Sequence, residues 1–468
     1  MLGEIVWRGF SLLYGFVSWI AMVARAVIRE GAFTKKMDEE EKRQLAAAQK
    51  RYWSLDQEPF PGFTHRFFRL RNGLKLHYVL NSNAGTSSAK NVAIFIHGFP
   101  DSFLLWRNIL KSSSLESHIL IAVDLPGYGG SDSFPRYGPN EVLEAMAEFI
   151  LGMRTEHMKE GSKMVVASHD WGAIVSARLA AEASQLADRW VIASAIIPEH
   201  VLSNASTRFA SAKQMLHTYL RRPLNIRLLK NALSTLVPII SQLGRSFYVF
   251  IFRLPYPFST SFVTFGNYWF LKLLHNVAAG LLRPDGSWSR KLGSKETAEF
   301  LSMSAGPSVT QILEAEGEYP ESVRKRAGDW GMSEKIRIYR EHLLLNPWEK
   351  SLETVVELSE IPTSLRRSSS GAGFLDEGPA GALKAPATVV YGIEDRSFDK
   401  RLGLEGLGDY LVKGSQLLTI AGAGHWLPFE GVGSKVLEEV VDWAMGDENE
   451  PLSETLEAMK DVRFVVEK

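Results

Sequence analysis

The residues best able to do chemistry lie in residues 163–180, where an apolar run precedes Ser-His-Asp-Trp-Gly and a small-residue helical pattern. This order predicts a strand, a sharp turn and a helix, the form of a nucleophile elbow. Such a turn tolerates only small side chains two positions before and after the nucleophile. Asp170 has Ser168 and Gly172 there, whereas a nucleophilic Ser168 would have Val166 and Asp170. We therefore predict Asp170 as a nucleophile that attacks an alkyl carbon of an epoxide or carbon–halogen bond and forms an alkyl ester.

Two further side chains could complete this chemistry, because water must be activated to hydrolyse the ester. Around such an elbow, an acid and then a histidine follow the nucleophile along the chain. Asp395 follows a buried apolar run, with Glu394 as its local competitor, and His425 lies in a glycine-rich loop after another such run. We predict that Asp395 orients His425 as the general base. The backbone N–H groups of Phe99 and Trp171 are the expected oxyanion hole.

These residues need a scaffold that brings distant loops together. Short apolar runs predict buried strands, and helical patterns separate them along the chain. This alternation favours an α/β fold with a doubly wound, mostly parallel sheet and right-handed crossovers. Besides the elbow strand, the expected strands are residues 92–96, 119–123, 190–196, 387–391 and 416–420, preceded by a hairpin over residues 64–80.

The strand pattern is interrupted in the second half of the chain. Residues 201–360 are rich in helix formers and aromatic residues, which predicts a mainly helical lid inserted into the core. The core would then consist of residues 52–200 and residues 386–446. Residues 361–385 are rich in Ser, Gly and Ala and predict a flexible excursion. Residues 447–468 form a tail for which no structure is predicted.

The N-terminal residues 1–35 predict a hydrophobic helix that anchors the chain in a membrane. Residues 5–28 are apolar and aromatic apart from two arginines, close to the length that a bilayer-spanning helix needs. More basic residues follow this stretch than precede it, so we expect the rest of the chain in the cytosol, at the endoplasmic reticulum. A signal peptide cleaved near residues 24–26 and an amphipathic interfacial helix are the alternatives. Residues 36–51 carry a charge run typical of a solvated helical spacer.

The composition is that of an ordinary globular protein. Its 53 basic residues balance its 53 acidic residues, which gives no indication of a nucleic-acid partner. The sequence contains no cysteine, so disulfides, thiolate metal sites and a cysteine nucleophile are excluded. The chemistry predicted for Asp170 requires neither a metal nor an organic cofactor.

Several motifs resemble the epoxide hydrolases of the α/β-hydrolase superfamily. The elbow is close to their Gly-His-Asp-Trp-Gly, with Ser168 in place of the first glycine. Residues 97–102, His-Gly-Phe-Pro-Asp-Ser, resemble their oxyanion loop, and residues 424–426, Gly-His-Trp, resemble their catalytic histidine region. The resemblance extends over about residues 61–444 and implies the α/β-hydrolase fold with a lid.

The same resemblance implies two lid tyrosines that hold and protonate the epoxide oxygen. Tyr248 lies in a segment similar to the first tyrosine region, followed by an aromatic residue and, seven residues on, a proline. Tyr339 lies in Ile-Tyr-Arg, similar to the Trp-Tyr-Arg of the second region. Tyr256, Tyr268 and Tyr319 are the reserve candidates.

The resulting hypothesis is an epoxide hydrolase that converts lipophilic epoxides, as in detoxification, into vicinal diols through an ester on Asp170. The first alternative is a haloalkane or haloacid dehalogenase with the same Asp-His-Asp set, in which the Trp171 indole would bind halide. The second is a catalytically inactive, membrane-tethered binding protein on the same fold. Acylation of Ser168 instead of Asp170 would indicate an esterase.

Overall fold

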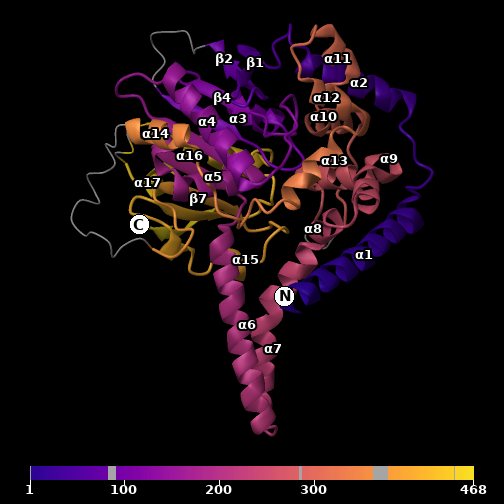
Figure 1. Ribbon diagram of the computed structural model, residues 1–468, viewed down its shortest axis with the longest axis vertical. Helices are drawn as coiled ribbons and strands as arrows, with labels where there is room; N and C mark the ends of the chain where they lie inside the picture. Colours follow the sequence, from indigo (N-terminus) through magenta and orange to yellow (C-terminus); the bar gives the residue numbers. More distant parts are fainter. Residues whose placement is uncertain (1, 83–90, 284–286, 362–377, 447, 449) are drawn as a thin grey trace.

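The computed structural model describes residues 2–82, 91–283, 287–361, 378–446, 448 and 450–468 (Figure 1). In these ranges nine strands form one sheet in the order β1-β2-β4-β3-β5-β6-β7-β8-β9. The strands are β1 (Phe63–Arg69), β2 (Lys75–Asn81), β3 (Val92–Ile96), β4 (Ile119–Val123), β5 (Met164–His169), β6 (Arg189–Ala193), β7 (Ala387–Gly392), β8 (Gln416–Ile420) and β9 (Val462–Glu467). The expected doubly wound, mostly parallel sheet is confirmed.

The centre of the sheet is parallel and buried on both faces. β3 pairs in parallel with β4 and β5, and β6, β7 and β8 continue the parallel order. Every residue of β3, β4, β5, β6 and β7 is buried, as expected of strands covered by helices on both sides. The loops at the carboxyl ends of these strands are therefore held on a rigid base.

Antiparallel strands close the two edges of the sheet. The hairpin β1–β2 forms one edge, as its alternating sequence predicts. At the other edge β9 pairs antiparallel with β8, with a register shift between Leu417 and Leu418. β9 lies in the tail for which no structure was predicted, although its burial alternates residue by residue as in a half-covered edge strand.

Helices cover both faces of the sheet. α5 packs with α4, and α16 packs with α3, which places the sheet between two helical layers. The helices of the core are α3 (Arg107–Leu110), α4 (Pro139–His157), α5 (Trp171–Glu182), α15 (Lys400–Gly403), α16 (Gly431–Met445) and α17 (Leu452–Thr455).

A helical insert lies between β6 and β7. Its helices are α6 (Pro198–Arg221), α7 (Ile226–Arg245), α8 (Phe247–Phe252), α9 (Tyr256–Ala278), α10 (Ser294–Ala305), α11 (Val309–Glu314), α12 (Glu321–Arg326), α13 (Met332–Lys335) and α14 (Leu352–Glu360). α9 is kinked where residues 265–268 leave the helical conformation. Residues 362–377 of the predicted flexible excursion lie outside the described residues, whereas Leu383 and Ala385, near its end, are buried.

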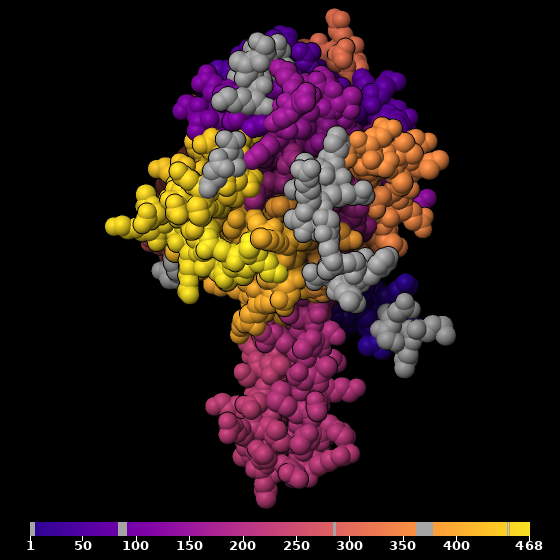
Figure 2. Space-filling model, turned by 90° about the vertical axis from the view of Figure 1, so that its left-hand side faces the viewer, coloured from indigo at the N-terminus to yellow at the C-terminus, as the bar shows by residue number. Residues whose placement is uncertain are grey.

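The helices α6 and α7 pair as a long hairpin that projects from the body of the molecule, which is the main departure from a compact lid (Figures 1 and 2). A helical lid was expected from the composition, but composition carries no information on whether its helices fold back or extend.

Two helices precede the sheet. α1 (Leu2–Glu30) lies along α8 and α9, and the Tyr14 hydroxyl donates a hydrogen bond to the Leu243 carbonyl, 3.0 Å away (Figure 1). α2 (Glu39–Trp53) is more than a solvated spacer, because one of its faces packs on α10. Its residue Trp53 is fully buried and donates its indole N–H to the Ser302 carbonyl at 3.1 Å.

Candidate active site

Asp170 lies at the turn between β5 and α5, with φ 52° and ψ −121°. This conformation is strained for a residue with a side chain, which costs about 1–3 kcal/mol and is typical of functional turns. A Cβ atom at Gly172 would lie 2.3 Å from the His97 carbonyl oxygen, so only glycine fits there. The other flanking residue, Ser168, is buried and donates its hydroxyl to the Val191 carbonyl at 3.1 Å. The Ser168 hydroxyl is thus bonded within the sheet, and the carboxylate of Asp170 occupies the elbow.

Both predicted oxyanion groups hydrogen-bond the carboxylate of Asp170. The backbone N–H of Phe99 donates to Oδ1 of Asp170 at 2.8 Å, and the backbone N–H of Trp171 also hydrogen-bonds this carboxylate. A Cβ atom at Gly98 would lie 2.3 Å from Oδ1, so the glycine lets the loop after β3 approach the elbow. The hole therefore already binds a carboxylate oxygen before any substrate arrives.

His425 lies between the two predicted carboxylates, in the loop after β8. Its Nδ1–H donates to Oδ2 of Asp395 at 2.9 Å, and its Nε2 lies 3.5 Å from Oδ2 of Asp170. Glu394, the competitor of Asp395, is exposed, whereas Asp395 is buried. The structure thus brings together the nucleophile, histidine and acid that the chain order predicts.

The electrostatics of this group are those of a buried ion pair. Burial disfavours the charged form of His425, but the flanking Asp395 and Asp170 raise its pKa well above its ordinary value. Burial by itself would raise the pKa of Asp170. The hydrogen bond and the charge of His425 act in the opposite direction and are stronger, so the pKa of Asp170 lies below its ordinary value. Both shifts favour an ionised Asp170 beside a protonated His425.

Both predicted lid tyrosines face the elbow. Tyr248 lies on α8, and Tyr339 ends a short 3₁₀ turn, Ile336–Tyr339, with the two ring centroids 6.0 Å apart. The Tyr339 ring lies 4.8 Å from that of Trp171, in an edge-to-face arrangement. Burial, and the charge of Asp170 among other groups, raise the pKa of both phenols. Both hydroxyls thus stay protonated across the physiological pH range.

The reserve tyrosines point to other partners. Tyr256 is 45% exposed, under the guanidinium of Arg340. Tyr268 stacks on Trp330 with ring centroids 3.6 Å apart. The Tyr319 hydroxyl donates to the Trp53 carbonyl at 2.7 Å.

Two side chains near the site were missed by the sequence reasoning, although both lie inside its motifs. His169 donates its Nε2–H to the carbonyl of His425 at 2.7 Å and so helps to hold the loop that carries the predicted base. Asp101 is fully buried and accepts the Trp426 indole N–H at 3.1 Å, while its Oδ1 has no hydrogen-bond partner among the described residues. Burial raises the pKa of Asp101 to about 7.

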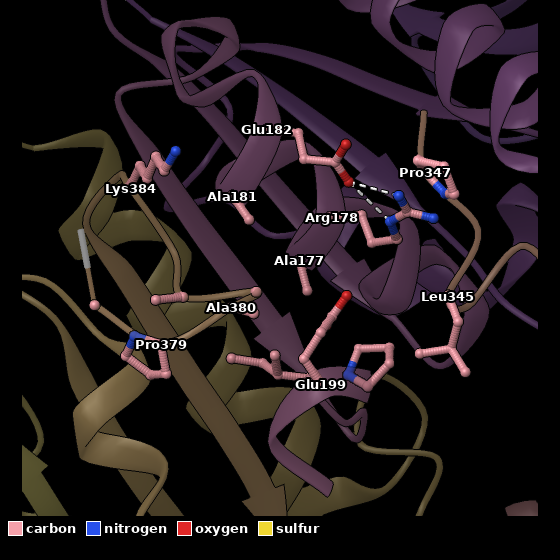
Figure 3. A pocket seen from close by; sticks show the side chains of 15 residues that line it. Ala177, Arg178, Ala181, Glu182, Glu199, Leu345, Pro347, Pro379, Ala380 and Lys384 are labelled. Carbon is pink, nitrogen blue, oxygen red and sulfur yellow. Dashed lines mark hydrogen bonds and ion pairs between the residues drawn. The ribbon is translucent and has the colours of Figure 1, made fainter. Parts of the chain in front are cut away.

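A separate cavity of about 370 Å³ lies at the far end of α5 (Figure 3). The guanidinium of Arg178 reaches into it but is held by Glu182 at 2.7 Å and by the Leu343 carbonyl at 2.7 Å. None of the predicted catalytic side chains lines this cavity. The cavity is therefore distinct from the candidate site.

Comparison with known proteins identifies relatives of this chain. The family described as "Alpha/beta hydrolase family" matches residues 93–443. Epoxide hydrolase 2 of Caenorhabditis elegans is 33% identical over 138 residues, which are 29% of this chain and 36% of that protein. A haloalkane dehalogenase of Sphingobium indicum is 37% identical over 82 residues, 18% of this chain and 27% of that protein. The chain thus matches only about a third of the length of these relatives.

A likeness to a solved structure extends further along the chain. The crystal structure of epoxide hydrolase VrEH1 from Vigna radiata covers 82% of this chain and 97% of its own, with 15% identity and a TM-score of 0.46.

Proposed function

Because this chain belongs to the α/β-hydrolase family, we propose that it is an epoxide hydrolase working through an ester on Asp170. The observation that carries the proposal is the pair of protonated lid phenols, Tyr248 and Tyr339, beside a carboxylate nucleophile with its own histidine and oxyanion hole. Opening an epoxide needs a nucleophile on carbon and a proton donor on oxygen. This site supplies both.

In the first step the two oxygens of Asp170 have different roles. Oδ1 is bound by the Phe99 N–H, which leaves Oδ2 to attack an epoxide carbon. The new C–O bond forms as the ring C–O bond breaks, and its electron pair goes to the epoxide oxygen. Tyr248 or Tyr339 donates the proton that this oxygen needs, and the product is a hydroxyalkyl ester of Asp170.

Ester formation prepares the second step by changing the charge beside His425. Once alkylated, Asp170 is neutral, so one of the two charges that raise the pKa of His425 is lost. After His425 has passed its proton to solvent or to the phenolate, its Nε2 can accept a proton from water. That water attacks the ester carbonyl carbon, and the N–H groups of Phe99 and Trp171 stabilise the charge on Oδ1. The bond between Cγ and Oδ2 then breaks, and His425 passes the proton taken from water to Oδ2. Oδ2 leaves as one hydroxyl of the diol, and the oxygen of water stays in the carboxylate of Asp170.

The competing function is halide displacement by the same nucleophile. A dehalogenase needs hydrogen-bond donors that stabilise the departing halide ion, whereas an epoxide hydrolase needs an acid that protonates the alkoxide. Here two phenols whose pKa values are raised lie at the candidate nucleophile, which favours the epoxide reaction. Assays with styrene oxide and with 1-bromohexane distinguish the two functions. Formation of a diol from styrene oxide would support an epoxide hydrolase, and release of bromide from 1-bromohexane would support a dehalogenase. A folded protein that forms neither product would contradict both.

We also propose that α1 attaches the chain to a membrane, with the catalytic part on the cytosolic side at the endoplasmic reticulum, where lipophilic epoxides partition. One helix, Ile5–Glu30, is long and apolar enough to cross a bilayer, and it is 17% buried. Rings of Phe10 and Tyr14 pack on Phe250, so one face of α1 contacts the insert. This contact favours the interfacial alternative over a spanning helix. Release from membranes by alkaline carbonate, without detergent, is the expected result, whereas resistance to carbonate would indicate a span.

A further inference from the structure

The chain has an unusual charge distribution around the projecting hairpin. Residues 200–284 contain no Asp or Glu but ten Lys or Arg, although acidic and basic residues are equally frequent in the whole sequence. The hairpin α6–α7 lies inside this segment and extends away from the body (Figure 2). Its surface is therefore cationic, with no carboxylate of its own beyond its first turn.

Each helix of the hairpin also carries a narrow stripe of apolar side chains. In α6 and α7 their spacing of seven, four or three residues keeps them on one side of each helix. Several are more than half exposed, including Phe209 at 61%, Leu233 at 54% and Ile240 at 63%. The stripe consists of Leu202, Phe209, Leu216 and Leu220 on α6, and of Ile226, Leu233, Val237 and Ile240 on α7.

The two stripes lie on the same face of the hairpin. The buried residues Ala212 and Ala232 mark where the helices contact each other. Successive residues of an α-helix are rotated by about 100° around its axis. Counted from the N-terminus to the C-terminus of each helix, the stripe is rotated by about 70° from Ala212 on α6 and by about 110° from Ala232 on α7, in the same direction. The two helices run in opposite directions and face each other. The same rotation away from their contact line therefore brings both stripes to one side of the hairpin. The hairpin therefore presents a continuous apolar face.

Basic side chains border this face. Lys213 lies one turn after Phe209, and Lys230 lies one turn before Leu233, on the same sides of their helices. Neither lysine forms an ion pair with any residue that the structure describes. An apolar strip bordered by unpaired cations matches the interface between lipid chains and anionic headgroups.

The base of the hairpin contacts both α1 and a loop of the candidate site. Tyr14 of α1 bonds to Leu243 near the end of α7. At the same end Gln242 donates to the Ser397 carbonyl at 3.0 Å and accepts the Asp399 N–H at 2.7 Å, in the loop that follows Asp395. A surface that binds this face would therefore be held in a defined orientation to the site.

We propose that the apolar face of the α6–α7 hairpin is a second membrane-docking surface, which binds bilayers containing anionic lipid. This proposal does not depend on the reaction that the site catalyses. The hairpin would lie with its stripe among the lipid chains and its lysines at the headgroups, beside α1. Membrane contact would then be made by two elements, α1 and the hairpin, which together fix the orientation of the protein on the surface.

The absence of cysteine allows a direct test on the full chain. Single cysteines are introduced by F209C or I240C on the stripe, and by S211C or N231C on exposed positions about 180–200° around the same helices. Each variant is labelled with the fluorophore NBD and mixed with phosphatidylcholine vesicles with or without phosphatidylserine. Since α1 is intact in all four proteins, each label reports the hairpin and not overall attachment.

The expected result is a shift of NBD emission to shorter wavelength for F209C and I240C with anionic vesicles, and little shift for S211C and N231C. A smaller response is expected without phosphatidylserine, and the additional substitutions K213E and K230E should reduce the anionic response. No shift on the stripe, or equal shifts on both faces, would overturn the proposal. A concentration-dependent shift without vesicles would overturn it too, because it would assign the face to a second copy of the chain.

Discussion

The Nε2 atom of His425 lies 3.5 Å from the Oδ2 atom of Asp170, the carboxylate oxygen that the Phe99 N–H does not bind. The histidine thus contacts the oxygen proposed to attack, and after ester formation it would face the water that attacks the ester. One histidine position can therefore serve two steps, first as the counter-ion of the nucleophile and then as a base.

The first prediction is that H425Q forms the ester but cannot hydrolyse it. The nucleophile is intact, whereas loss of the base should slow hydrolysis by about 10²- to 10⁴-fold. Mass spectrometry of the denatured protein after mixing with styrene oxide should show the added mass of one substrate molecule. The matched control is the double variant D170N/H425Q, in which no adduct should form. An adduct that persists in the double variant, or that maps to Ser168, would contradict the assignment of the nucleophile.

A second prediction concerns the lid phenols. Y248F and Y339F should each slow ester formation, and the double variant should slow it by about 10²-fold or more, because the leaving alkoxide then lacks a proton donor. Single-turnover kinetics isolate this step from hydrolysis. Y256F is the control, since Tyr256 is exposed on the insert and lies against Arg340. Equal rates for the double variant and the control would remove the tyrosines from the mechanism.

The charge around His425 leads to a third prediction, that D170N lowers the pKa of this histidine towards about 6.5, its usual value. Both flanking carboxylates raise it in the native protein, and the neutral amide imitates the alkylated state. Histidine resonances followed by NMR against pH, assigned with H425Q, measure the change. An unchanged pKa would argue against the proposed switch from counter-ion to base.

The same shift has a consequence for stability. The pKa of His425 is higher in the folded protein than in the unfolded chain. Its contribution to the free energy of unfolding is therefore fully present below the pKa of the unfolded chain and is lost as the pH rises through the pKa of the folded protein. Denaturant unfolding should therefore show a steeper loss of stability on the alkaline side for the native protein than for D170N.

The fourth prediction concerns Asp101, whose burial raises its pKa from 3.8 to about 7. Between these values the folded protein binds a proton that the unfolded chain has lost, so this group's contribution to stability falls as pH rises from about 4 to about 7. D101N removes the titration and keeps an acceptor for Trp426. Its free energy of unfolding should match the native value near pH 4 and exceed it by a few kcal/mol above pH 7, at about 1.4 kcal/mol per pKa unit.

The contrast to be measured is the pH dependence and not stability at one pH. Parallel curves for the native protein and D101N between pH 4 and 8 would mean that Asp101 does not titrate in this range. Kinetic constants measured in parallel would separate this effect from any influence on the site.

Local sequence alone determined the parts of the protein that depend on short-range sterics and on periodicity. The apolar runs predicted the central strands, because a strand covered on both faces must be apolar along its whole length. The small residues around Asp170 favoured it over Ser168 as the candidate nucleophile, since the tight turn leaves no room for a larger side chain at Gly172. The chain order then indicated Asp395 and His425, which the fold brings within 2.9 Å of each other.

Only the tertiary structure decided features that depend on what each segment packs against. α2 reads as a charged helix, yet Trp53 is buried because α10 covers one face. β9 is an edge strand, and only the fold shows that it pairs with β8. The resemblance favoured Tyr248 and Tyr339, but only the path of the insert brings their rings within 6.0 Å of each other. Whether α6 and α7 fold inward or project was likewise undetermined, because an apolar stripe has the same sequence whether it contacts protein or lipid.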